Sequence, residues 1–121
     1  MKKLFVSIPM RGRDTENIAR SFIKLHKIAE SIVGEELELI QSFILAKAPA
    51  GVNESIWYLG ESIKMMAEAD YFACVRQHYE YNGCAVESFV ARRYGIPTIL
   101  IDREWVCPDI KENENLENFE E

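Results

Sequence analysis

The sequence lacks the features that mark several large classes of protein. Among its 121 residues, no apolar run approaches the ~20 residues that span a bilayer. The start, Met1-Lys2-Lys3, leads straight into a strand-like run rather than a signal peptide. Three cysteines without a Cys-x-x-Cys pair argue against a disulfide framework or a zinc site. We therefore expect one cytoplasmic globular domain that needs no metal and no cofactor.

Patterns that bind phosphate chains or nucleic acid are missing as well. The sequence has no Gly-x-Gly-x-x-Gly and no Walker A ending of Gly-Lys-Ser/Thr. Its net charge of −6 is uneven: residues 109–121 hold six acids and one lysine, a net −5, which leaves −1 for residues 1–108. Neither part has the basic stripe that a nucleic-acid polymer requires. We expect a domain at 1–108 and an acidic tail at 109–121, which in one alternative recruits a partner.

The hydrophobic pattern predicts strands that alternate with helices. Strand-like runs occupy 3–8, 36–40, 71–75 and 98–101, and residues 105–108 are a candidate for a further short edge strand. Helices are expected from Asp14 or Thr15 to Gly34, over 56–70 and over 82–94. Right-handed crossovers then give a parallel sheet covered on both faces. We predict a flavodoxin-like (Rossmann-like) α/β three-layer sandwich of four to five strands in the order 2-1-3-4, with ligands bound at the carboxyl ends of strands one and three.

The stretch Tyr81-Asn82-Gly83-Cys84-Ala85-Val86-Glu87 opens the last long helix. We expect Asn82 to be its N-cap. A helical wheel places Glu87 inside an apolar arc and Ser88 opposite that arc. The arc consists of Gly83, Cys84, Val86, Val90, Ala91 and Tyr94. A carboxylate there is desolvated on one side. In the alternative, Glu87 is an ordinary first-turn acid that complements the helix dipole and reaches solvent.

A second candidate feature is Arg11-Gly12-Arg13, which precedes the first helix. Free amides at a helix N-terminus and planar guanidinium groups favour an anion such as phosphate; the alternative is a solvated turn with two surface arginines. Four aromatic side chains are candidates for stacking on a base, although such residues more often pack in the core. They are Phe43, Trp57, Tyr79 and Tyr81. The cysteines have no histidine partner in the sequence, so a thiol nucleophile is not expected.

These segments, in this order and spacing, resemble the nucleoside 2-deoxyribosyltransferase superfamily, which includes the 2'-deoxynucleoside 5'-phosphate N-hydrolases. The matching segments are residues 4–12, Ala69-Asp70, Gly83-Cys84-Ala85-Val86-Glu87 with Ala91, and Gly95-Ile96-Pro97. They span residues 4–101. The chain looks closest to a compact bacterial and phage branch that carries Gly-Cys-x-x-Glu.

The resemblance implies that Glu87 is a nucleophile. It would attack the anomeric carbon of a (deoxy)nucleoside or nucleotide and displace the base, leaving a glycosyl-enzyme ester that water or a second base resolves. The resemblance also implies a homo-oligomer, a dimer or larger. The substrate-binding residues that it implies are Ser7, Ile8, Pro9, Met10, Arg11, Gly12, Arg13, Ser62, Tyr81, Asn82 and Gly83.

The chain departs from the family at two places. The Tyr81-Asn82 region replaces a polar side chain that family members carry shortly before the helix of the nucleophile. Family members carry an aspartate two turns before the third strand, and that position is Ser62 here, next to Glu61. The missing carboxylate supports an alternative function, in which the protein is a catalytically weak or inactive nucleotide-binding or sensing module.

Overall fold

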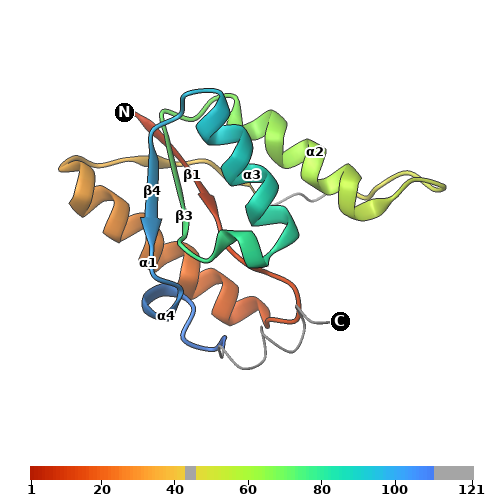
Figure 1. The fold of residues 1–121 in the computed structure, drawn as a ribbon, viewed down its shortest axis with the longest axis horizontal. Coiled ribbons are helices and arrows are strands. Elements are labelled where there is room, and N and C mark those ends of the chain that lie inside the picture. The colour runs from red at the N-terminus through yellow and green to blue at the C-terminus, as the bar shows by residue number, and fades with distance from the viewer. Residues whose placement is uncertain (43–45, 111–121) are drawn as a thin grey trace.

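A computed structural model describes residues 1–42 and 46–110 of the chain. Figure 1 shows strands and helices that alternate along most of the sequence. In chain order the elements are β1 (Lys3–Ser7), α1 (Thr15–Val33), β2 (Glu38–Leu39), α2 (Glu54–Met66), β3 (Tyr71–Val75), the 3₁₀ turn η1 (His78–Glu80), α3 (Asn82–Arg93), β4 (Thr98–Ile101) and α4 (Arg103–Val106).

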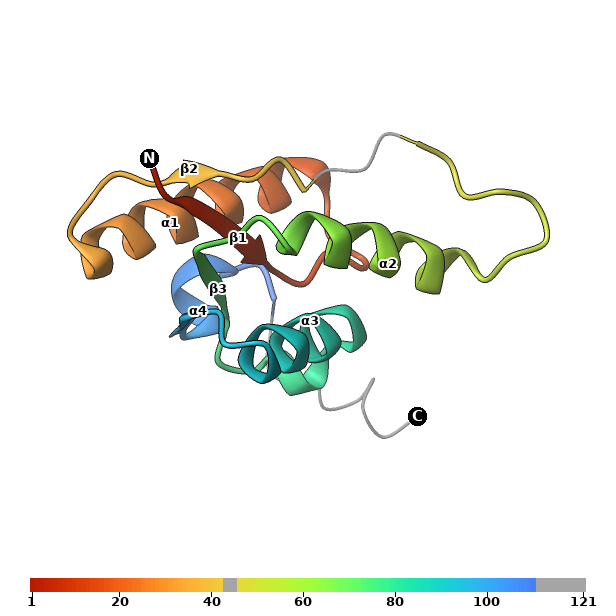
Figure 2. The same ribbon diagram turned by 90° about the horizontal axis from the view of Figure 1, so that it is seen from above.

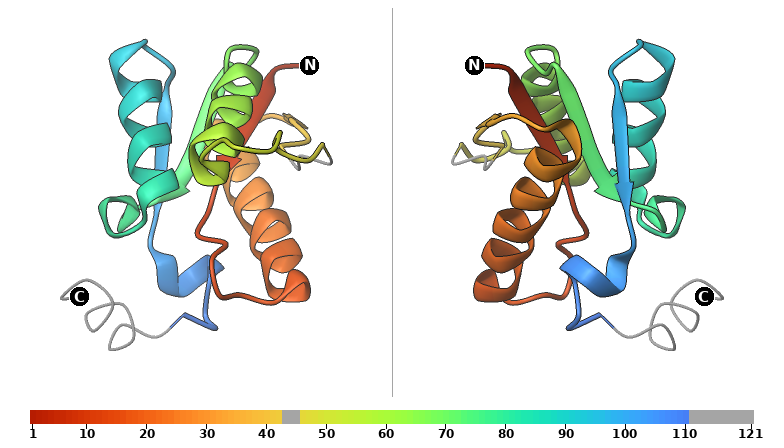
Figure 3. Two further views of the ribbon diagram at one scale, coloured as in Figure 1. Left: turned by 90° about the vertical axis from the view of Figure 1, so that its right-hand side faces the viewer. Right: turned by 90° about the vertical axis from the view of Figure 1, so that its left-hand side faces the viewer.

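The strands form one parallel sheet in the order β2-β1-β3-β4, which confirms the predicted order. Helices α1 and α4 pack together on one face, and α2 and α3 pack together on the other (Figures 2 and 3). The protein therefore has the predicted flavodoxin-like α/β architecture, with four strands in the described part of the chain. None of the helices described is long and apolar enough to cross a membrane.

The core lies around the two central strands, β1 and β3. Leu4, Phe5 and Val6 are buried along β1, and the rings of Phe5 and Phe72 stack with their centroids 5.9 Å apart. Helices cover both faces of these strands, so every side chain along them faces an apolar layer. This is why the strands read as continuous apolar runs rather than as alternating ones.

Local capping signals set the ends of the helices. The Asp14 carboxylate accepts a hydrogen bond from the backbone amide of Asn17 at 2.8 Å and so caps α1. Gly34, with a φ of 84°, ends the same helix in the left-handed conformation. Gly95 does the same after α3, with a φ of 77°. These predictions are confirmed.

The expected N-cap of α3 is wrong. The helix begins at Asn82, and Tyr81 occupies the cap position without a side-chain cap hydrogen bond. The 3₁₀ turn η1 ends at Glu80, and the next residue, Tyr81, has an extended backbone conformation. The carbonyl of Tyr81 accepts the first hydrogen bond of the helix, from the amide of Ala85 at 2.8 Å. Asn82 is therefore already inside the first turn.

The helical wheel predicted the buried face of α3 only in part: Cys84 and Ala91 are buried as expected, but so is Ser88, which was expected on the opposite side. Cys84, Ser88 and Ala91 face the sheet and are buried, whereas Val86 is 40% exposed and Tyr94 is 82% exposed. Small side chains form the contact stripe because they let the helix backbone approach the strands closely. At ~100° per residue, Glu87 lies roughly 60° from the middle of this stripe, at its edge.

Residues 105–108 are not an edge strand. Arg103–Val106 form the short helix α4 instead, and Val106 and Cys107 are buried against the α1 side of the sheet. The apolar pattern of so short a segment fits a strand or a helical turn equally well, and packing on α1 selects the turn.

Candidate active site

Glu87 lies over the carboxyl ends of the two central strands. Ser7 is the last residue of β1 and pairs in register with Cys74 of β3. Its buried hydroxyl donates a hydrogen bond to Glu87 Oε1 at 2.6 Å, across 80 residues of sequence. This is the point where the direction of winding reverses in a 2-1-3-4 sheet, the usual position of ligands in such folds.

Helix α2 contributes a second hydroxyl, that of Ser62, to the surroundings of the Glu87 carboxylate. Burial raises the pKa of Glu87 above its ordinary value, and side-chain hydrogen bonds from Ser7 and Ser62 partly offset this shift. The three residues come from β1, α2 and α3. The result is a half-desolvated carboxylate that hydroxyl donors orient and favour in its charged form.

Two cysteines border this cluster. Cys84 lies one turn before Glu87 and is buried. The pKa of its thiol is raised well above the ordinary value, by hydrogen bonding with Cys74 first and by burial second. Such thiols stay neutral and are poor nucleophiles. The thiol of Cys84 therefore borders Glu87 as an uncharged group.

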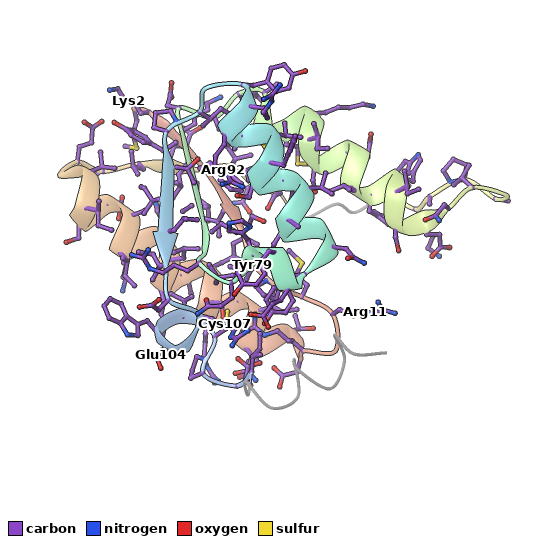
Figure 4. All side chains as sticks on the ribbon, in the orientation of Figure 1. Lys2, Arg11, Tyr79, Arg92, Glu104 and Cys107 are labelled. Atoms are coloured by element: carbon purple, nitrogen blue, oxygen red, sulfur yellow. The ribbon has the colours of Figure 1, made fainter. Side chains whose placement is uncertain are left out.

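The two arginines of the 9–13 loop lie in different environments. Arg11 is exposed, and its side chain extends away from the body of the fold (Figure 4). The side chain of Arg13 is only 4% exposed and donates hydrogen bonds to Asp109, to the Pro9 carbonyl and to Ser21. Arg11 is thus the arginine that can meet a ligand, while the guanidinium of Arg13 is engaged within the protein.

The N-terminus of α1 is also engaged. Asp14 caps it with its own carboxylate, which accepts from the amide of Asn17. A negative side chain at this position opposes a second anion there. Within the residues described, the case for an anion site in this loop therefore depends on Arg11.

The remaining predicted site residues lie around the same end of the sheet. Asn82 and Gly83 are exposed in the first turn of α3, one turn before Glu87. The Tyr81 hydroxyl accepts a hydrogen bond from Arg103 Nη1 at 2.8 Å. In the first loop, Ile8 is buried and Met10 is exposed. Glu61, next to Ser62, is paired with Lys64 at 2.8 Å rather than with Glu87.

The aromatic candidates differ in their access to a ligand. Tyr79 is exposed in η1. Trp57 is half-buried and packs edge-on against Tyr58, with ring centroids 5.1 Å apart. Phe43 lies outside the residues described. Of the three described rings, Tyr79 is therefore the one that is exposed for stacking on a ligand.

Sequence reasoning missed two charged side chains, the half-buried Asp109 and the buried Arg103, that organise this end of the sheet. Asp109, assigned to the acidic tail, binds Arg13. Arg103 donates to Glu80 and Tyr81 and ties α4 to η1. Neither has a local signal, because each partner is far away along the chain.

Within residues 1–42 and 46–110, no group of three or more His, Cys, Asp or Glu side chains is placed to hold a metal ion. The chain matches no family model, no curated protein and no solved structure.

Proposed function

We propose that the protein cleaves the N-glycosidic bond of a small (deoxy)nucleoside or nucleotide, as an N-hydrolase or a deoxyribosyltransferase, with Glu87 as the nucleophile. The observation that carries the proposal is the 2.6 Å hydrogen bond from Ser7 to Glu87 at the carboxyl end of β1. It holds a half-buried carboxylate in a fixed orientation at the position where this fold binds ligands.

The proposed reaction has two steps. A Glu87 carboxylate oxygen bonds to the anomeric carbon while the bond from that carbon to the base nitrogen breaks, and the base leaves with the electron pair and takes up a proton. Water or a second base then attacks the same carbon, and the ester bond breaks to regenerate the carboxylate. Water loses its proton in this step, so that the free sugar and the ionised enzyme are restored.

Partial burial supports such a role. The transition state carries positive charge on the sugar ring, and a carboxylate in a partly dehydrated site stabilises that charge more strongly than one in water. Burial alone would leave Glu87 protonated over a wider pH range, because it raises the pKa of the carboxyl. The hydroxyls of Ser7 and Ser62 counter this shift and favour the ionised, nucleophilic form.

Arg11 favours a nucleotide over a bare nucleoside. It is exposed on the loop that leaves β1, directly after Ser7 and Ile8. A guanidinium at this end of the sheet can pair with a phosphate through two parallel hydrogen bonds. Since Arg13 and the α1 N-terminus are already engaged, the phosphate contact would fall to Arg11.

The test is the release of free base. The protein is incubated with pooled nucleosides and nucleoside monophosphates, and the products are separated by chromatography. We expect base release by the wild type and by Glu104→Gln, an exposed carboxylate on α4 that serves as the control. Loss of release is expected in Glu87→Ala and Glu87→Gln. Equal turnover by the wild type and Glu87→Ala would exclude Glu87 as the nucleophile.

One observation favours a second function. Ser62 stands where the resembling family has an aspartate, and Glu61 beside it is paired with Lys64. In this second function the site binds a nucleotide without turning it over, as a sensing module does. In that case a nucleotide raises the melting temperature without base release, and Glu87→Gln retains binding.

A further inference from the structure

The side chain of Arg13 joins segments that are far apart in the sequence. Its Nε and Nη2 donate to the two carboxylate oxygens of Asp109, each at 2.8 Å, across 96 residues. Asp109 is 22% exposed and Arg13 is 4% exposed, so water competes little for this pair. The parallel, charge-assisted geometry is the strongest form of such a contact and also the most demanding in position.

The same guanidinium fixes the loop that leads from β1 to α1. Nη1 donates to the Pro9 carbonyl at 2.7 Å, and Nη2 donates to Ser21 Oγ at 2.6 Å. The hydroxyl of Ser21 in turn donates to the Val106 carbonyl. One side chain therefore ties the start of the loop, helix α1 and the segment after α4 together.

The loop at residues 9–13 forms few hydrogen bonds besides those of the Arg13 side chain. Gly12 adopts a φ of 75°, and the amide of Arg13 donates to the Met10 carbonyl at 3.2 Å. Met10 and Arg11 are exposed. An exposed arginine binds an anion more tightly when its backbone is already held, because less conformational entropy is lost on binding.

We propose that Asp109 is a positioning residue: through Arg13 it holds residues 9–13 in the conformation that presents Arg11 to the anionic group of the substrate. The proposal rests on the proposed function for the identity of that substrate. It assigns Asp109 to the folded body rather than to the acidic tail. The charge of Asp109 is available for this role at neutral pH, since the hydrogen bond from Arg13 holds the pKa of its carboxyl below the ordinary value.

Limited digestion with trypsin tests whether Asp109 keeps residues 9–13 in place, and it does so without an activity assay. Trypsin cleaves after arginine, and fragments that begin at Gly12 report how often the loop opens. We expect Asp109→Asn to speed this cleavage on the order of tenfold, because cleavage follows the population of the open loop. Asp109→Glu, which keeps the charge, should restore much of the protection, and Glu104→Gln should match the wild type. Unchanged cleavage in Asp109→Asn would overturn the proposal.

A second measurement separates positioning from a purely structural role. With a 2'-deoxynucleoside 5'-monophosphate, Asp109→Asn should raise KM on the order of tenfold and leave kcat nearly unchanged, since uniform binding is lost. The KM of the corresponding nucleoside, which lacks the phosphate, should change by less than about twofold. If both KM values rise equally, or neither changes, Asp109 does not act through an anion contact and the proposal fails.

Inorganic phosphate distinguishes failure of this proposal from failure of the proposed function. As a probe, it should slow trypsin cleavage after Arg11 in the wild type and have a weaker effect in Asp109→Asn. If the wild type releases no base but this difference is seen, the glycosidase function is wrong and the positioning role stands. If base is released and phosphate protects both proteins equally, the positioning role is wrong and the glycosidase function stands.

Discussion

Replacing Ser7 with alanine removes the hydroxyl that contacts Glu87 and little else. The side chain is buried, and its hydroxyl donates the 2.6 Å hydrogen bond to Glu87 Oε1 and also lies in hydrogen-bond contact with the Cys84 thiol. A hydrogen bond to a charged group contributes about 1.5–3 kcal/mol, and one between neutral groups about 0.5–1.5 kcal/mol. We therefore expect Ser7→Ala to lower the free energy of unfolding by the larger amount where Glu87 is ionised, and by the smaller where it is protonated.

The sign of the pH dependence follows from linkage. Burial raises the folded-state pKa of Glu87 above 4.5, so the folded state binds more protons than the unfolded state as pH rises beyond that value. Stability contributed by this group therefore falls as pH rises through the folded pKa. The Ser7 hydroxyl opposes the shift, so its loss steepens the fall. Well below pH 4.5 the carboxyl is protonated in both states, and there the variant differs least from the wild type.

Urea unfolding measures this difference. The free energies of unfolding of the wild type and Ser7→Ala are compared at about pH 4 and about pH 8, and Ser31→Ala, an exposed serine on α1, is the matched control. The acidic limb of the pH–rate profile should also move to higher pH in Ser7→Ala. An equal loss of stability at both pH values, with an unmoved acidic limb, would refute the idea that Ser7 stabilises the ionised carboxylate.

Two further substitutions test the site and the core. Ser62→Asp should raise the pKa of Glu87 by like-charge repulsion, and a shift of the acidic limb of the pH–rate profile to higher pH would show this. If base release also becomes faster, a carboxylate at position 62 is the group that the site lacks. Phe5→Ala should lower the free energy of unfolding by about 3–5 kcal/mol, because it empties a buried space beside Phe72. A loss below about 1 kcal/mol in urea would contradict the described core.

Much of the architecture follows from short stretches of sequence. The strands at 71–75 and 98–101 begin and end where the apolar runs predict. Asp14 and Gly34 delimit α1, because a cap needs only a side chain or a glycine near the helix end. The strand order follows from the alternation of strands with helices and from the polar pattern of residues 36–40.

The candidate site could be predicted in part. Chain topology was sufficient to expect Glu87 near the first loop, and the structure brings Ser7 and Ser62 to it. The sequence did not indicate that Arg13 is engaged by Asp109 while Arg11 is exposed. Arg11 and Arg13 flank the same glycine and look alike in the sequence. They differ in the structure because Arg13 has a partner, Asp109, that lies 96 residues away along the chain.

The sequence by itself determined which segments are strands and helices and where most of them end, because these properties depend on residues close together in the chain. One helix end is an exception: α2, predicted to reach residue 70, ends at Met66. The strand order followed from the general rules for connections between parallel strands. Tertiary structure alone decided which side of α3 is buried: Ser88, expected on the exposed side, faces the sheet. It also decided that residues 105–108 follow a helical turn and that Asp109 belongs to the folded body. Each of these depends on contacts between distant segments, whose free energy no local pattern records.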